Sequence, residues 1–129
     1  MDTAAIRRDL HDMETHRGAW VSILRQASDH AIFPEVYVEA AEEVETASRI
    51  FSQTLEEEDP QSISLALAAV DRLVVASPLI FNAIDALSGS AGARHDADGF
   101  KAWLAHERTA LAMLCLERSM IGITEKTPA

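Results

Sequence analysis

The residues best suited to chemistry in this chain are concentrated near its start, in RRDLHDMETHRGAW, residues 7–20. This stretch holds two histidines, three carboxylates and three arginines. Imidazole and carboxylate groups together can bind a metal ion, transfer a proton or accept a phosphoryl group. The spacing of the two histidines, and the helix that positions them, decides which of these chemistries is open.

A shared metal ion would require both histidines to face the same way. Neighbours on a helix face lie three or four residues apart, whereas His11 and His16 are five apart. On a helix of ~3.6 residues per turn they point about 140° apart. The remaining histidines are scattered, at His30, His95 and His106. Asp12 and His16 supply at most half a site, so the sequence predicts neither a metal centre nor a cofactor.

The helical phase of the stretch separates its polar side chains. Ile6, Leu10 and Met13 follow steps of three and four, which is typical of the apolar stripe of a helix. Relative to this stripe His11 points outward, Asp12 lies on the flank and His16 lies nearer the core edge. An outward histidine beside an acid is suited to attack on an electrophile such as a phosphoryl group.

The segment IRRDLHD, residues 6–12, resembles the phosphoacceptor box of the sensor histidine kinases that pair with LuxR-type response regulators. The resemblance implies that His11 is the phosphoacceptor, that Asp12 is the acidic base and that His16 orients water for dephosphorylation. Thr15 stands where that family usually has glycine, and no ATP-binding domain follows. At most, a stand-alone phosphotransfer or docking module is implied. A phosphodonor would then label the protein but not its His11→Ala variant.

Arg17 occupies the apolar stripe between Met13 and Trp20, where a leucine would be expected. In one interpretation its apolar stem crosses the core edge and the guanidinium reaches solvent. In the other it forms a buried pair with an acid such as Glu107, or anchors an interface. The sequence leaves both interpretations open.

Four helices must position these residues. Apolar periodicity and the placement of proline and glycine predict helices over residues 3–29, 35–57, 61–76 and 99–121. At Ser77-Pro78 the chain either kinks or begins a fifth, short helix that ends at Leu87. The predicted fold is therefore an all-α bundle of four to five helices, forming a single domain over residues 1–129.

The ends of these helices carry local signals. Asp59 followed by Pro60 is typical of a helix start. Residues 88–99 hold three of the five glycines and are predicted to form a loop, with Asp96 or Asp98 as the cap of the last helix. Gly122 is predicted to end that helix, and residues 123–129 to form a frayed tail.

The last helix carries two apolar stripes. One contains Glu107 and Arg118 among its apolar residues, and these charges need partners. The other, on roughly the opposite side, includes Met113, Leu116 and Met120. A helix with two apolar faces is either central in a core or packed on a second subunit. We expect a homodimer.

The charge distribution limits the kinds of partner. The formal net charge is −10, and residues 35–59 carry nine acids against one base. A basic surface for nucleic acid is excluded. The acids Glu39, Glu42 and Glu43 instead form a face that is either simply solvated or meets a basic protein surface.

These features favour a small acidic regulatory or adaptor protein that binds other proteins and has no catalytic activity of its own. One alternative is the phosphotransfer module with His11, and another is an acidic inhibitor or immunity protein against a basic or nucleic-acid-binding partner. Cys115 is the one cysteine, so no internal disulfide can form. The opening residues lack an apolar run and the longest uncharged apolar stretch, residues 73–84, is too short to cross a bilayer. We expect a cytoplasmic protein.

Overall fold

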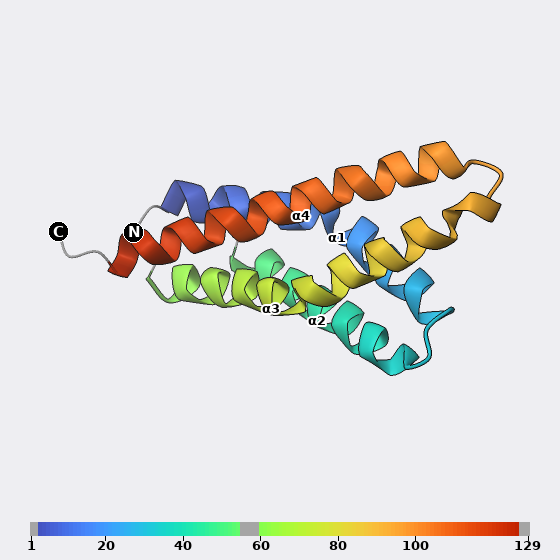
Figure 1. Ribbon diagram of the computed structural model, residues 1–129. Coiled ribbons are helices and arrows are strands. Elements are labelled where there is room, and N and C mark those ends of the chain that lie inside the picture. Colours follow the sequence, from blue (N-terminus) through green and yellow to red (C-terminus); the bar gives the residue numbers. More distant parts are fainter. Residues whose placement is uncertain (1–2, 55–59, 127–129) are drawn as a thin grey trace.

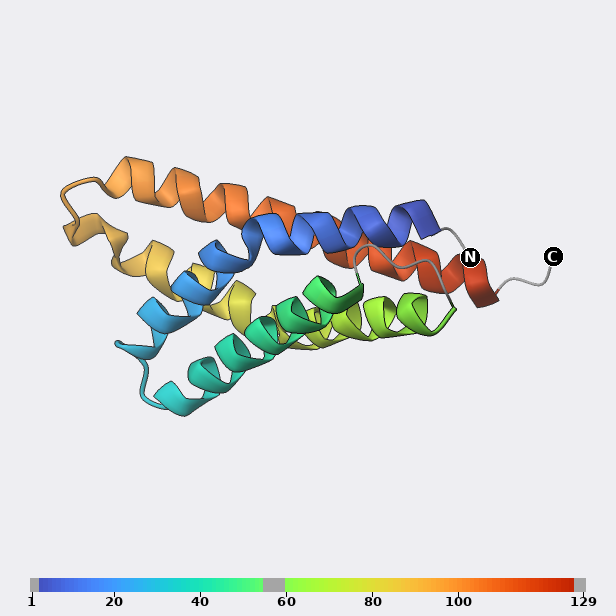
Figure 2. The same cartoon turned by 180° about the vertical axis from the view of Figure 1, so that it is seen from behind.

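A computed structural model describes residues 3–54 and 60–126. Over these ranges the chain is an all-α bundle without strands, as predicted. Its helices are α1 (Thr3–Ser28), α2 (Pro34–Thr54), α3 (Pro60–Ser90) and α4 (Ala97–Lys126), with a short 3₁₀ turn, η1 (Ala91–Ala93), before α4. Figures 1 and 2 show the bundle from opposite sides: α1 lies along α4, and α2 lies along α3.

The apolar stripes of the helices form one core, as their spacing predicted. Leu10, Met13 and Trp20 on α1 are at most 1% exposed, and Leu104 and Leu111 on α4 are fully buried. Every third or fourth residue of a helix returns to the same side, so these positions face the neighbouring helices together. Truncating one such leucine to alanine typically costs about 2–5 kcal/mol.

Helix α3 lies at the centre of the bundle and contacts α1, α2, α4 and η1. It is the one helix in the described ranges, Gln61–Ser90, that has the length and composition to cross a membrane, with a mean hydropathy of 1.8 over an 18-residue window. The core helix of a water-soluble bundle has the same two properties. Leu73 and Ile80 of α3 are fully buried among the other helices.

Pro78 does not start a new helix, because α3 runs through it without interruption. A proline inside a helix removes one N–H, so the carbonyl four residues earlier loses its donor. That carbonyl belongs to Val74, and the Ser77 hydroxyl donates to it at 2.6 Å. The helix changes direction near its middle (Figures 1 and 2). Of the two sequence-based alternatives, a proline within one continuous helix is confirmed.

Several predicted boundaries were wrong. The loop predicted over residues 88–99 is much shorter, because α3 continues to Ser90 and α4 begins at Ala97. Asp96 directly precedes α4, and its carbonyl accepts the Phe100 backbone N–H at 2.9 Å. Gly122 lies within α4, which ends at Lys126, because one helical glycine costs only ~1 kcal/mol relative to alanine.

The remaining boundaries agree to within a few residues. Pro60 is the first residue of α3, as its sequence context predicted, and α2 begins at Pro34. The predicted cap Asp59 and the predicted end of the second helix, residue 57, lie outside the described residues, which resume at Pro60. In the predicted tail, residues 123–126 are helical, and residues 127–129 lie outside the described part.

Candidate functional site

The polar side chains of α1 meet α4 along one seam of the bundle. His16 Nδ1 lies 2.7 Å from Glu107 Oε2, and this carboxylate accepts the imidazole N–H. The Glu107 side chain is 6% exposed and that of His16 is 19% exposed. The His16 ring stacks on Trp20 with centroids 5.4 Å apart, while the Trp20 indole N–H points to the Glu107 carbonyl oxygen at 3.4 Å. The imidazole is thus held by a buried acid and a buried ring.

His106 adds a third polar group to this seam. Its ring centroid lies 5.8 Å from that of His16, with the two rings tilted by 47°. One ligand-type atom each from His16, His106 and Glu107 lie within 4.8 Å of one another. His16 of α1 therefore has its polar neighbours, His106 and Glu107, on α4 and not on its own helix. The position of Glu107 within an apolar stripe indicated from the sequence that this acid needs a partner. The helical periodicity alone could not identify His16 as that partner.

A second group on the same seam consists of carboxylates. Asp9 is fully buried, and it lies with Asp12 of α1 and Glu117 of α4 so that one oxygen of each is within 4.8 Å of the others. Among the described residues, no group donates a hydrogen bond to either Asp9 oxygen. The neighbouring carboxyl groups of Asp12 and Glu117 cannot do so when they are ionised, because an ionised carboxylate only accepts hydrogen bonds. Burial, the neighbouring Glu117 carboxyl and, less strongly, Asp12 raise the pKa of Asp9 to about 8, against a smaller opposing effect of Arg8.

The structure separates the three residues of the predicted phosphotransfer box. His11 and Asp12 are exposed on α1, whereas His16 faces α4 and bonds to Glu107. A histidine that is held by Glu107 is poorly placed to orient water beside His11, because the two side chains leave the helix in different directions. Phosphorylation of His11 stays a prediction.

Arg17 does not pair with Glu107, the partner that one interpretation gave it. Its guanidinium lies 3.4 Å from Glu14 of the same helix, and its side chain is 43% exposed. The end of the guanidinium therefore reaches the surface, which is closer to the other interpretation, while its Nε is buried without a hydrogen-bond partner among the described residues. The position next to Glu107 belongs instead to His16, one residue earlier.

One further charged side chain of α4, Arg118, has an interhelical partner. Arg118, predicted to need a partner, donates from Nε to Asp71 Oδ1 at 2.6 Å and from Nη2 to Asp71 Oδ2 at 3.2 Å. This pair joins α4 to α3. Cys115 is half-buried, and burial raises the pKa of its thiol above the ordinary 9.0, against a weaker opposing effect of the nearby Ser77 side chain. A thiol that is harder to ionise is less reactive, so Cys115 fits the role of a small apolar residue.

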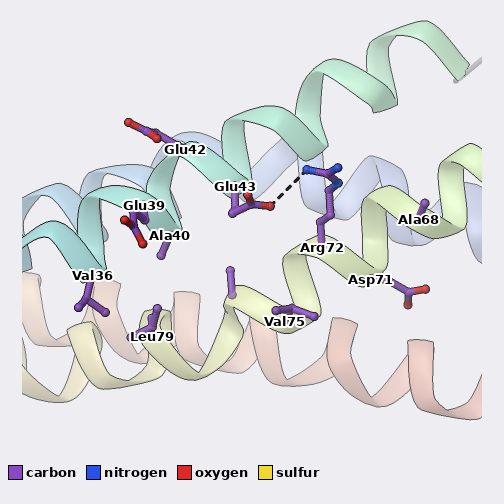
Figure 3. Close-up of a pocket in the computed structure, with 11 residues that line it drawn as sticks. Val36, Glu39, Ala40, Glu42, Glu43, Ala68, Asp71, Arg72, Val75 and Leu79 are labelled. Carbon is purple, nitrogen blue, oxygen red and sulfur yellow. Dashed lines mark hydrogen bonds and ion pairs between the residues drawn. The ribbon is translucent and has the colours of Figure 1, made fainter.

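The acidic residues of α2 line a groove between α2 and α3. The groove has a volume of about 670 Å³ and is shown in Figure 3. Its apolar lining consists of Val36, Ala40, Ala68, Val75, Ala76 and Leu79, and its charged lining of Glu39, Glu42, Glu43, Asp71 and Arg72. Arg72 bonds to Glu43 at 3.3 Å. Glu39 and Glu42 form no ion pair with any residue in the described ranges.

A smaller hollow of about 300 Å³ continues the groove toward the α1–α2 connection. It shares Val36 and Leu79 with the groove and adds Ala31, Ile32, Phe33 and Tyr37. Ile32 is 88% exposed and Phe33 66% exposed, and Val75 in the main groove is 80% exposed. An apolar track with acids beside it thus crosses this face of the molecule.

The outer face of α4 is the second exposed apolar surface. Met113, Leu116 and Met120 are 52–59% exposed, so the second stripe of the last helix is not part of the core. Earlier on the same face, four exposed side chains are small, Ala102, Ala105, Thr109 and Ala112, and the exposed His106 lies at its edge, seven residues before Met113. The Thr109 hydroxyl donates to the Ala105 carbonyl at 3.0 Å, which leaves the face without an unsatisfied polar group at that position.

Comparison of the chain with models of known protein families, with curated proteins and with solved structures found no match. Family membership therefore assigns no role to any of these residues. The functional conclusions below rest on the α2–α3 groove, the α1–α4 seam and the outer face of α4.

Proposed function

We propose that this protein is an adaptor that binds a basic amphipathic helix of a partner protein in the groove between α2 and α3. The feature that carries the proposal is the combination, in one groove, of an exposed apolar track with carboxylates on its edge. The proposal includes no catalytic step, and it keeps the cytoplasmic location that the sequence favours.

The apolar track explains why a partner would bind there at all. Val75, Ile32 and Phe33 leave most of their surface in water, and covering such surface contributes about 25 cal/mol per Å² before the costs of association. A helix lying in a groove typically inserts side chains spaced by three, four and seven residues. The groove and its neighbouring hollow together offer such a helix a continuous apolar floor.

The charges select among the helices that fit this floor. Glu43 is already paired with Arg72, and Asp71 with Arg118. Glu39 and Glu42 are therefore the groove carboxylates left to meet a partner, and Figure 3 shows Glu39 beside the apolar side chains and Glu42 on the outer edge. Lysine or arginine on the flank of the bound helix would complement both, and would also speed association at low salt.

The direct test uses a labelled synthetic helix of leucine on one face and lysine on the other, with binding followed by fluorescence anisotropy. We expect the double variant Glu39→Lys, Glu42→Lys to weaken binding at least tenfold and to remove most of its salt dependence. Val75→Ser, which removes apolar surface without adding charge, should weaken binding to a similar extent without a change in the salt dependence of what remains. Circular dichroism checks that each variant stays helical.

A matched control reverses two exposed acids outside the groove, Asp96→Lys and Asp98→Lys, which changes the net charge by the same amount. This control should bind the peptide within about threefold of the wild type, because neither acid lines the groove or the neighbouring hollow, and charges in solvent are screened over a Debye length of ~8 Å. Equal weakening by the control and the groove variant would show a general charge effect and would contradict the proposal. Unchanged binding by the groove variant would contradict it as well.

We further propose that the adaptor is a homodimer formed through the outer face of α4. The first half of this face carries small apolar side chains, such as Ala102 and Ala105, and its second half carries large ones, such as Leu116 and Met120. Two copies of α4 packed antiparallel about a two-fold axis would place the large half of each against the small half of the other. Such self-complementarity is what a two-fold interface requires.

A further inference from the structure

We propose that His16, His106 and Glu107 form a binding site for a divalent transition-metal ion, with Zn²⁺ as the best-suited ion. Two imidazoles and one carboxylate meet at the α1–α4 seam, with a ligand atom from each within 4.8 Å of the others. The site is separate from the groove of the proposed adaptor function, which lies between α2 and α3. It therefore stands or falls independently of that function.

The donor types define the class of ion. Imidazole nitrogen suits zinc and its neighbours in the first transition series, whereas Ca²⁺ and Mg²⁺ prefer all-oxygen ligand sets. Two histidines and one glutamate are also a known three-ligand set for zinc, with water at a fourth position. His106 is exposed while Glu107 is buried. An ion bound here would accordingly keep one side open to solvent.

The geometry needs only a small adjustment. Zinc lies ~2.0–2.2 Å from nitrogen and carboxylate oxygen ligands, so the three ligand atoms would be about 3.3 Å apart around it. His16 Nδ1 and Glu107 Oε2 are 2.7 Å apart with a hydrogen between them, and the ion would replace that hydrogen. His16 presents a lone pair at Nδ1 when its proton is on Nε2, the other neutral tautomer. His106, on the exposed side, has the freedom to swing toward the ion.

The surroundings of His16 hold the first ligand in place. Its ring stacks on Trp20, which is fully buried, so the imidazole loses little freedom when an ion binds. A bound cation would also compensate the charge of Glu107, which is buried beside one histidine. Since His16 and Glu107 are 91 positions apart, the ion would link the two ends of the chain and stabilise the folded state by mass action.

Isothermal titration of the full chain with ZnCl₂ tests the site. We expect one Zn²⁺ per chain with a dissociation constant below about 10 μM, a rise of the melting temperature with Zn²⁺, and no effect of Mg²⁺ at the same concentration. His106→Ala should weaken Zn²⁺ binding at least tenfold. This residue is exposed, so its loss should leave the melting temperature of the metal-free protein unchanged. Glu107→Gln, which keeps the side-chain size, provides a second variant.

His11→Ala and His95→Ala are the matched controls, because both remove an exposed histidine outside the site. Each should bind Zn²⁺ within twofold of the wild type. Visible absorption of bound Co²⁺ adds a readout of coordination geometry that should change in His106→Ala but not in either control. Zn²⁺ binding that is absent in the wild type, or equally strong in His106→Ala and the wild type, would overturn the proposal.

Discussion

Asp9 is the residue whose surroundings fit its charge least well. Its side chain is fully buried next to the carboxyl of Glu117, with no hydrogen-bond donor to either Asp9 oxygen among the described residues. A buried ionised carboxylate without a donor is costly. Protonation of Asp9 removes this cost, because the neutral carboxyl group can donate a hydrogen bond to Glu117. The raised pKa of Asp9, about 8, expresses this preference for the protonated form.

This preference makes a prediction about stability and pH. The pKa of Asp9 is about 8 in the folded protein and near the ordinary 3.8 in the unfolded chain. Between these values the folded state holds a proton that the unfolded state has lost. The Asp9 contribution to the free energy of unfolding therefore falls as pH rises, by up to ~1.4 kcal/mol per pH unit. Below about pH 4 both states are protonated and the effect vanishes.

Asp9→Asn should remove this pH dependence, because the amide stays neutral and can donate to Glu117. Urea unfolding at several pH values between 5 and 8 is the measurement. We expect the variant to gain stability relative to the wild type as pH rises, with its largest advantage near pH 8. Asp98→Asn, at an exposed position, is the control and should follow the wild type. A constant difference between Asp9→Asn and the wild type over this range would disprove the assignment.

Helix α3 illustrates how an element can tolerate a residue that should interrupt it. Pro78 lacks the N–H that would bond to the Val74 carbonyl, and the Ser77 hydroxyl supplies a donor in its place. Ser77 is only 6% exposed, so water cannot easily take over that bond. The local sequence Ser-Pro is ambiguous because it fits a helix start as well as a repaired helix interior.

Ser77→Ala should therefore destabilise the protein by about 1–3 kcal/mol, the usual cost of leaving a buried polar group without a partner. Thermal or urea unfolding measures this loss. Ser64→Ala, an exposed serine on the same helix, should change stability by no more than about 0.5 kcal/mol. If both substitutions had equally small effects, the Ser77 hydroxyl would not be what supports the helix at Pro78.

For the whole molecule, the prediction concerns the outer face of α4. Leu116 is 54% exposed, and in the proposed dimer it packs against the small residues of the second copy. Leu116→Glu should convert the dimer into a monomer, since it buries an unpaired charge in the interface. Sedimentation equilibrium reports the mass directly. The far-ultraviolet circular dichroism should stay unchanged, because Leu116 lies outside the core.

Leu65→Glu provides the control for this experiment. Leu65 is 44% exposed on α3, so the same chemical change is made on another face, and the variant should remain dimeric. A wild-type protein that is monomeric at 100 μM would refute the dimer. A Leu116→Glu variant with the wild-type dimer mass would refute the assignment of the interface to this face of α4.

The sequence by itself determined the all-α fold, the inner faces of α1 and α4 and the start of α3 at Pro60. These are local properties, because the helical repeat places every third or fourth residue on one side whatever the partner is. Exposure of His11 and the second apolar face of α4 followed from the same repeat. The acids of α2 were visible in the sequence as well, but not the groove that they share with α3.

Only the tertiary structure decided which side chains meet across the bundle. The sequence identified Glu107 as an acid in need of a partner, yet the partner is His16 rather than Arg17. Asp9 likewise meets Glu117 from α4. The axial offset and rotation of α1 against α4 come from the packing of the whole core, and a helix repeat contains no information on either. The two polar groups of the α1–α4 seam arise from that packing.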